Sequence, residues 1–291
     1  MRAYNTNLFT NNDADSYYLL GLFITDGNMY HGEASLSSID LDILNKIDKL
    51  LSTKTCISKK SNSNCYRLRI NNKIIFNWLL QNGCIPNKTK VVKFPDVPKQ
   101  YIPDFIRGLI DGDGNIGMYK NRAVIRFDSA SLDLITKFSD ELILLGINNK
   151  ISLTKWIKTT INGKQIKSTT QMYRIALSGL KVYKLLKIMY YSDTSLYIQR
   201  KKEVARTIYN YFEKSGFSQD DLIKLDKFPM YKWVSDQELI DCCIKHKGVF
   251  KLVAKEYSIS SESISRRLKK IGKYDFIRNL FPFIKINNLK K

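Results

Sequence analysis

The sequence predicts an α+β fold made of two pseudo-symmetric halves, followed by a small all-α domain. Three observations lead to this prediction. An apolar segment that ends on Asp-Gly occurs twice, at 19–27 and at 106–114. After each segment come strand-like and helix-like runs in the same order. From about residue 233 this pattern gives way to short helical segments only.

Each half is expected to run helix, two strands, helix, two strands, helix. In the first half, the periodicity predicts elements near 13–26, 28–31, 33–37, 40–51, 54–60, 65–71 and 74–80. In the second half, it predicts elements near 106–114, 116–120, 122–128, 132–145, 150–158, 171–178, 180–189 and 199–212. Asp13 or Asp15 can cap the first helix. Because the strand runs alternate between apolar and polar residues, antiparallel sheets with one polar face are expected.

The two Asp-Gly segments carry small residues that would let their helices pack closely. Each has two such residues spaced four apart, on one helix face: Gly21 with Thr25, and Gly108 with Gly112. Small residues at this spacing allow two helix backbones to approach each other. The two segments are therefore expected to form a central helix pair.

Each segment also places a carboxylate at the C-terminal end of its helix. Asp26 and Asp113 precede Gly27 and Gly114, which are expected to adopt the left-handed conformation just past a helix end. A helix C-terminus is negative, and pairing the helices would bring the two acids together, so a positive partner is required. A divalent cation is the natural candidate. For either copy alone, an ordinary helix stop is the alternative.

Both segments resemble the LAGLIDADG motif of homing endonucleases, in its monomeric two-motif form. The last acid of the motif, which the family uses for metal, is present in both copies as Asp26 and Asp113. The first copy departs from the family pattern at Ile24, whereas the second keeps Asp111. The resemblance extends over about the first 210 residues. It implies αββαββα halves whose curved antiparallel sheets sit in the DNA major groove.

The resemblance further implies metal-dependent hydrolysis of duplex DNA at a long, asymmetric site. Asp26 and Asp113 would bind Mg2+, for which Mn2+ or another divalent metal could substitute. Each acid would serve one strand, so that the pair makes a double-strand break.

The family also tends to place a basic residue near each metal. In the second half this points to Lys201, and in the first half Lys88, Lys90 and Lys93 compete, with Lys90 chosen. Contact with the phosphate backbone alone is the alternative role for these lysines.

The chain is strongly basic, with 48 Lys and Arg against 27 Asp and Glu and a net charge of +21. Such an excess points to a polyanionic partner, nucleic acid before membrane. The polar strand faces supply candidate contacts to double-stranded DNA: Arg67, Arg69, Arg122, Arg126 and Lys158. Each of these could instead be an ordinary solvent-facing residue of a half-exposed sheet.

Four regions are expected: half 1 at 1–100, half 2 at 101–214, a linker at 215–232 and a DNA-binding domain at 233–291. Within the last region, the segment 252–271 resembles a helix-turn-helix. The start and outer face of its recognition helix would carry Ser263, Arg266, Arg267 and Lys270. A small packing or dimerisation bundle is the alternative.

Other classes of protein find little support. No apolar run is long enough to span a membrane, and no signal-peptide core precedes the first helix, so a cytoplasmic or organelle-matrix protein is expected. Five cysteines without Cys-x-x-Cys spacing and two histidines predict no zinc site and fit a reducing compartment. Without a terminal Cys or Ser nucleophile or a final His-Asn, self-splicing is not expected.

Three functions therefore stay open. The first is a homing endonuclease that acts as a monomer in intron homing. The second is a transcription regulator with a LAGLIDADG-like fold, although such regulators typically lose the motif acids. The third is a maturase that binds its host intron RNA. Mg2+-dependent cleavage separates the first from the second, and tight binding to structured intron RNA identifies the third.

Overall fold

The computed structural model describes residues 4–52, 57–61, 63–119, 122–154, 158–161, 164–167, 170–191, 194–214, 236–256 and 261–281. The chain divides into two compact units, Met1–Leu222 and Ile223–Lys291. The predicted linker 215–232 and the predicted turn at Asn162-Gly163 lie outside the described residues. In the part of the chain that is described, no helix combines the length and apolar character needed to cross a bilayer.

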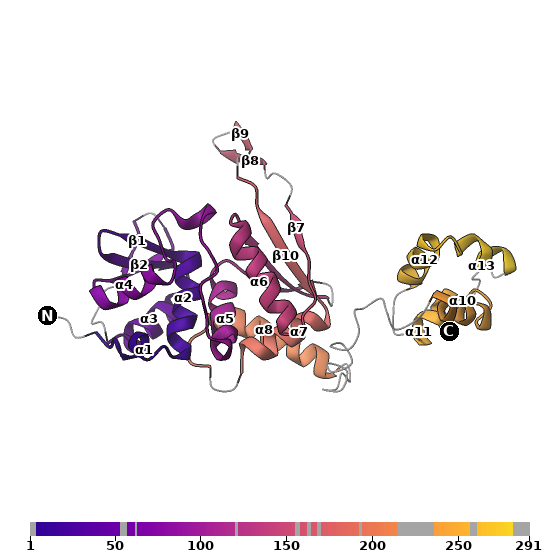
Figure 1. Ribbon diagram of the computed structural model, residues 1–291, viewed down its shortest axis with the longest axis horizontal. Helices are drawn as coiled ribbons and strands as arrows, with labels where there is room; N and C mark the ends of the chain where they lie inside the picture. The colour runs from indigo at the N-terminus through magenta and orange to yellow at the C-terminus, as the bar shows by residue number, and fades with distance from the viewer. Residues whose placement is uncertain are drawn as a thin grey trace. The chain divides into compact units, whose positions relative to one another are not determined.

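The first half of the larger unit is a four-stranded antiparallel sheet with its helices (Figure 1). Its elements are α1 (Asn7–Thr10), α2 (Ala14–Asp26), β1 (Gly27–Tyr30), β2 (Glu33–Ser38), α3 (Leu41–Leu50), β3 (Ile57–Lys59), β4 (Tyr66–Ile70) and α4 (Lys73–Gln81). The strand order is β1-β2-β4-β3. Leu36 lies opposite Leu68 in this sheet, and both are fully buried, so this face forms part of the core.

The second half repeats this architecture. Two short 3-10 turns, η1 (Lys88–Lys90) and η2 (Lys99–Tyr101), connect the first half to it. Its elements are α5 (Ile102–Gly112), β5 (Asn115–Tyr119), β6 (Arg122–Ser129), α6 (Leu132–Leu144), β7 (Ile151–Leu153), β8 (Lys158–Ile161), β9 (Lys164–Lys167), β10 (Tyr173–Ser178), α7 (Leu180–Met189) and α8 (Gln199–Lys214). The strand order β5-β6-β10-β7 matches that of the first sheet, with the β8–β9 hairpin inserted between its third and fourth strands. The predicted α+β fold with two pseudo-symmetric αββαββα halves is confirmed.

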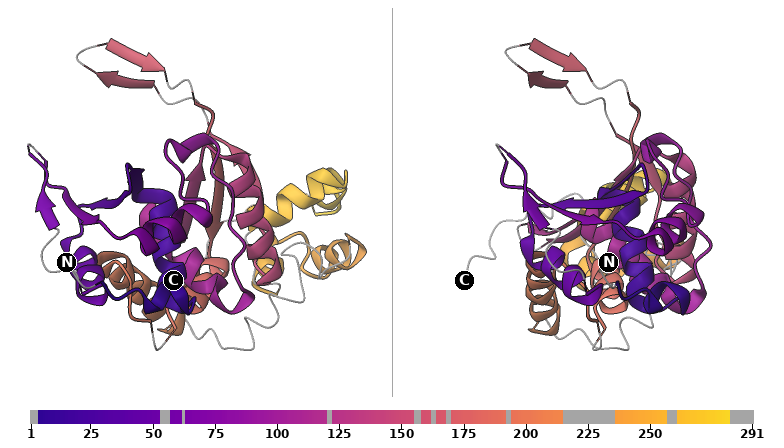
Figure 2. Two further views of the ribbon diagram at one scale, coloured as in Figure 1. Left: turned by 60° about the vertical axis from the view of Figure 1, so that its left-hand side comes forward. Right: turned by 90° about the vertical axis from the view of Figure 1, so that its left-hand side faces the viewer.

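Helices α2 and α5 form the centre of this unit and pack on each other along their small residues (Figure 2). A β-carbon at Gly21 would lie 2.4 Å from the Phe105 carbonyl oxygen. A β-carbon at Gly108 would lie 2.2 Å from the Tyr18 carbonyl oxygen, and one at Gly112 would lie 1.9 Å from Thr25 Oγ1. The four predicted interface residues therefore lie in the contact between the helices.

Some local expectations were wrong. Gly27 has a φ of −78°, and Gly114 is not among the residues with positive φ, so neither is left-handed. Both glycines instead provide room, because a β-carbon would lie 2.5 Å from the Phe23 carbonyl oxygen at Gly27 and 2.6 Å from that of Ile110 at Gly114. Leu153 lies on edge strand β7 and is 65% exposed, although its strand was expected to alternate between apolar and polar residues. Asp13 caps α2, accepting a hydrogen bond from the Ser16 amide.

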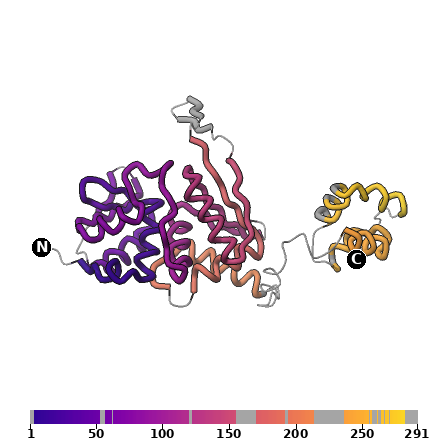
Figure 3. The backbone as a smooth tube through the Cα atoms, in the orientation of Figure 1, coloured from indigo at the N-terminus to yellow at the C-terminus, as the bar shows by residue number. Residues whose placement is uncertain are grey.

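The smaller unit is all-α in its described part, which Figure 3 traces along the backbone. Its helices are α10 (Asp236–Lys245), α11 (Phe250–Glu256), α12 (Ser261–Lys270) and α13 (Tyr274–Leu280). Sequence periodicity did not predict α13. Gly248 and Gly272 have φ of +74° and +67°, a left-handed conformation that glycine adopts without strain, and each follows the end of a helix. The helices enclose a core of their own: Leu239, Cys243, Val253, Ile264, Leu268 and Ile277.

Candidate active site and nucleic-acid interface

The two motif acids lie at the C-terminal ends of the central helices, just before the first strand of each sheet. Helix α2 ends at Asp26 and β1 begins at the next residue. Asp113 is the C-cap of α5, and β5 begins two residues later. The chain therefore passes directly from each acid into the first strand of a sheet.

The two carboxylates are available for a ligand. Asp26 and Asp113 are exposed, and within the described residues neither has a hydrogen-bond partner. The Asp26 carboxylate lies against the end of the partner helix, since its Oδ2 would be 3.4 Å from a β-carbon at Gly112. Desolvation by the surrounding protein and, next, the negative charge of Asp113 raise the pKa of the Asp26 carboxylate to about 6. Desolvation also raises the pKa of Asp113.

Lys201 supplies positive charge beneath Asp113. Its side chain is buried, and its Nζ donates to the carbonyl oxygens of Ile110 (2.7 Å), Asp111 (2.6 Å) and Gly114 (2.7 Å). These carbonyls belong to the last turn of α5 and the residues after it, where the helix dipole is negative. Burial lowers the pKa of Lys201 to about 8, although the Asp111 charge opposes this. In this arrangement Lys201 caps the helix that carries Asp113.

Lys88 occupies the corresponding place in the first half. Its Nζ donates to the carbonyl oxygen of Gly27, directly after the end of α2. Burial lowers the pKa of Lys88, whereas the charges of Asp113 and Asp26 raise it. Lys90, the residue chosen from the sequence, is exposed at the end of the same turn. The catalytic role of either lysine stays a prediction.

Asp111, the extra acid of the second motif, is fully buried behind the site. It accepts hydrogen bonds from the Tyr18 hydroxyl (3.0 Å), the Tyr190 hydroxyl (2.9 Å) and the Ile198 amide (3.0 Å). Tyr18 lies on α2, and Ile198 directly precedes α8. Asp111 thus connects the two central helices to the start of the helix that carries Lys201.

A second buried group fixes the chain ahead of α8. Arg107 is 1% exposed and donates to the carbonyl oxygens of Met189 (2.8 Å) and Leu196 (3.0 Å) and to Asp104 (2.8 Å). Nothing in the motif spacing had singled out Arg107. Its position one residue before the small Gly108 is the only sequence signal that it lies in the helix interface.

The site fits a hard divalent cation. Its free donors are the oxygens of two carboxylates, which are the ligands that Mg2+, Mn2+ and Ca2+ prefer. After desolvation, the negative charge of Asp113 is a cause of the raised pKa of Asp26, and a bound cation would offset that charge.

The open faces of the sheets carry the predicted arginines. Arg69 lies 4.0 Å from Glu33 across the first sheet, and Arg67 is half-buried beside it. Arg122 donates to the Ser178 hydroxyl, and the Arg126 guanidinium lies 5.9 Å from the centre of the Tyr119 ring. Lys158 lies on β8, and its side chain is outside the described part.

A family model for the LAGLIDADG-like domain matches residues 13–82 and 101–188, one match in each half. The chain belongs to this family. Both LAGLIDADG-like halves contain the complete four-stranded sheet of the fold and one of the two exposed acids.

Relatives of the chain include longer proteins that carry names unrelated to LAGLIDADG. The DNA-directed RNA polymerase subunit Rpo1C of Methanocaldococcus jannaschii is 32% identical over 129 residues, which are 42% of this chain and 15% of that protein. The probable translation initiation factor IF-2 of the same organism is 23% identical over 289 residues, 94% of this chain and 21% of that protein. The chain therefore spans about a fifth or less of the length of these relatives.

Two solved structures are similar to part of the chain. Mesophilic variants of the homing endonuclease I-DmoI share 19% identity, with a TM-score of 0.44 over 66% of this chain and 97% of that chain. The meganuclease I-SmaMI bound to uncleavable DNA shares 11% identity, with a TM-score of 0.45 over 73% and 97%.

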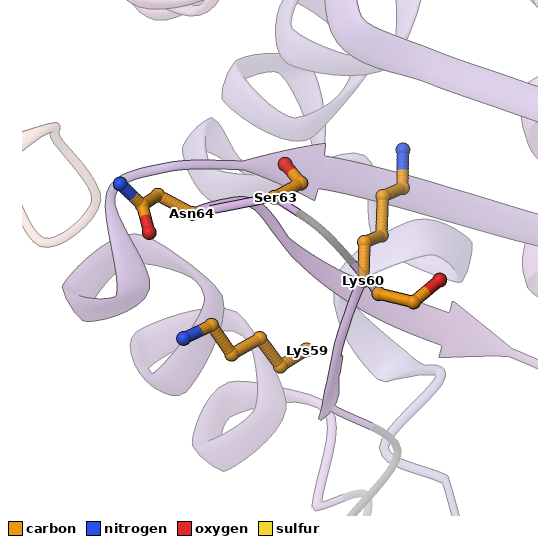
Figure 4. A pocket seen from close by; sticks show the side chains of 5 residues that line it. Lys59, Lys60, Ser63 and Asn64 are labelled. Atoms are coloured by element: carbon orange, nitrogen blue, oxygen red, sulfur yellow. The ribbon is translucent and has the colours of Figure 1, made fainter.

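Two polar features of the LAGLIDADG-like sheets were not predicted. Arg174 donates through Nε and Nη2 to the two carboxylate oxygens of Asp128 across β10 and β6, at 2.7 Å each. Beside the end of β3 lies a shallow, open surface pocket of about 600 Å3 lined by Lys59, Lys60, Ser61, Ser63 and Asn64 (Figure 4).

In the C-terminal unit, α12 covers the segment in which the sequence predicts the recognition helix. Arg267 donates from Nε to Asp236 at 2.9 Å, so its guanidinium is engaged within the unit. The side chains of Ser263, Arg266 and Lys270 lie outside the described part.

Proposed function

We propose that this protein is a site-specific homing endonuclease that makes metal-dependent double-strand breaks in a long, asymmetric duplex. The observation that carries the proposal is the pair of exposed carboxylates, Asp26 and Asp113, at the ends of the central helices and beside both sheets. A purely structural fold would not be expected to keep two repelling carboxylates without hydrogen-bond donors at its centre.

The chain's own residues would bind and orient the reacting groups. Asp26 and Asp113 would hold Mg2+, or Mn2+ in its place. When bound, the cation would polarise the scissile phosphate and lower the pKa of an attacking water. Lys201 would fix the end of α5 so that Asp113 keeps its position, and Lys88 would do the same for Asp26. Each acid would serve one DNA strand.

The polar sheet faces would position the duplex. Arg67, Arg69, Arg122 and Arg126 lie on strands whose opposite faces form the core, so their side chains are directed away from it. A two-stranded ribbon fits the major groove, and guanidinium groups there can read base edges or bind phosphates. The net charge of +21 supports a polyanionic partner.

The C-terminal unit would extend the contact as a helix-turn-helix. Its support is the succession of α11 and α12, joined over four residues and closed on a core of its own. Four residues of α12 would face DNA: Ser263, Arg266, Arg267 and Lys270. Arg267 would have to leave Asp236 to do so.

Cleavage of a randomised duplex library in Mg2+ tests the proposal. The intact protein is expected to make specific double-strand breaks, and Asp26→Asn or Asp113→Asn alone is expected to leave nicks in opposite strands. Asp140→Asn serves as a matched control, because Asp140 is an exposed residue of α6. Binding without cleavage in every divalent metal tried would favour a regulator instead, and tight binding to intron RNA would favour a maturase. Gel filtration with light scattering tests the monomer.

A further inference from the structure

The C-terminal unit contains three side chains of metal-binding type that the nuclease proposal does not use. Cys242 and His246 lie four residues apart on α10, and Glu256 is the last residue of α11. One sulfur, one imidazole nitrogen and one carboxylate oxygen lie within 4.8 Å of one another. The cluster is distinct from the acids of the larger unit in both position and chemistry.

Local structure explains why these three side chains meet. A spacing of four residues places Cys242 and His246 on the same face of α10. Lys247 and Gly248 then have positive φ, which ends α10 and turns the chain back so that α11 packs against it. This return brings Glu256 beside His246. A search for Cys-x-x-Cys spacing could not detect the cluster, because its third member depends on the fold.

The existing contacts show how closely the groups are held. His246 Nε2 and Glu256 Oε2 are in direct contact, and Lys245 Nζ lies 3.1 Å and 3.3 Å from the two Glu256 oxygens. Cys242 is buried, His246 is partly buried and Glu256 is exposed, so the cluster opens to solvent on its carboxylate side. A cation could therefore enter, and it would take the place of Lys245 as the counter-charge of Glu256.

The donor set selects the cation. Zinc accepts sulfur, nitrogen and oxygen ligands at about 2.0–2.3 Å in a tetrahedron, which separates its ligand atoms by roughly 3.3–3.7 Å. The three donor atoms lie within 4.8 Å of one another, at most about 1.5 Å farther apart than this geometry requires. Magnesium prefers oxygen only, so a thiolate and an imidazole discriminate against it.

We propose that Cys242, His246 and Glu256 bind one zinc ion, with water as the fourth ligand. The ion ties the end of α10 to the end of α11, five residues before α12 begins. Zinc binding thus stabilises the helices that precede the proposed recognition helix. This inference does not depend on nuclease activity.

Titration of the full-length protein with Co2+, a spectroscopic substitute for zinc, tests the site. Only a cysteine ligand gives the near-ultraviolet thiolate-to-cobalt band, so the carboxylates of the larger unit cannot mimic it. One equivalent of Co2+ is expected to produce the band, and one equivalent of Zn2+ is expected to abolish it. Cys242→Ser should remove the band, whereas Cys65→Ser, a matched change in the other unit, should leave it intact.

Two further variants make the test independent of folding. Glu256→Gln changes an exposed residue, and we expect it to weaken Co2+ binding about tenfold or more while the unfolding temperature in chelator stays unchanged. His246→Gln should weaken binding similarly, whereas His31→Gln should not. The proposal is overturned by absence of the band in the intact protein, by its persistence in Cys242→Ser, or by unchanged affinity in Glu256→Gln.

Discussion

Replacing Gly108 by alanine is expected to force the two central helices apart. The new β-carbon would lie 2.2 Å from the Tyr18 carbonyl oxygen, 2.9 Å from the Leu22 amide nitrogen and 3.0 Å from the Gly21 α-carbon. All three are backbone atoms of α2, so no side-chain rotation can relieve the contact. Since ordinary contacts begin at 3.4 Å, the helices must separate by about 1 Å at this crossing.

The magnitude follows from two opposing contributions. Overpacking costs about 1–3 kcal/mol of unfolding free energy, and a contact between backbones belongs at the upper end of that range. Alanine recovers up to about 1 kcal/mol through its higher helix propensity. We therefore expect a net loss of about 2 kcal/mol. For a unit of this size, that loss lowers the Tm by about 4–8 °C.

Thermal unfolding followed by circular dichroism measures the effect, and DNA cleavage reports whether the acids at the helix ends have moved. Gly117→Ala is the matched control, because its β-carbon would meet only the ring of Tyr119, which can turn away. The reasoning is refuted if Gly108→Ala unfolds at the same temperature as Gly117→Ala or at a higher one.

Three further predictions concern the polar groups around the site. Asp111→Leu leaves three buried donors without an acceptor, so urea unfolding should show that the free energy of unfolding falls by about 3–5 kcal/mol. Asp111→Asn should lower this free energy by less. Equal losses in the two variants would contradict the prediction. Ca2+ affinity, measured by calorimetry, should fall about tenfold from pH 7 to pH 5. The reason is that protons compete with the cation for Asp26 once the pH falls through its pKa of about 6. An affinity that does not change with pH would count against Asp26 as a ligand. Lys88→Met should slow cleavage of one strand by roughly tenfold in a nicking assay. Lys90→Met should change the cleavage rate by no more than about twofold in the same assay. The reverse order of effects would favour Lys90 as the residue near the metal.

Local periodicity predicted much of the fold. The helix expected at 180–189 is α7 (Leu180–Met189), and the alternation of apolar and polar residues located β4 and β6 to within one or two residues. These features depend on neighbours along the chain. The small residues of the two motifs similarly predicted the central helix pair, because backbone contact admits few residue types.

Features that depend on distant chain segments were not predictable. The spacing of Lys88 and Lys90 gives no sign of which one turns toward Gly27, since that depends on how η1 packs. The pairing of Arg174 with Asp128 requires the register of β10 on β6. The glycines after the motif acids fit the pattern of a left-handed cap, yet close packing on the preceding helix turn is what requires them.

The buried acid of the second motif shows why the two halves are not interchangeable. At the corresponding place in the first motif stands Ile24, which is 3% exposed and packs as an apolar residue. Asp111 instead receives donors from α2 and from the chain ahead of α8, and so fixes the helix that brings Lys201 under Asp113. Lys88 reaches Gly27 from a single 3-10 turn, without a comparable buried acceptor among the described residues. Similar positions of Asp26 and Asp113 are therefore achieved by different supports, and equal substitutions in the two halves should differ in their effect on stability.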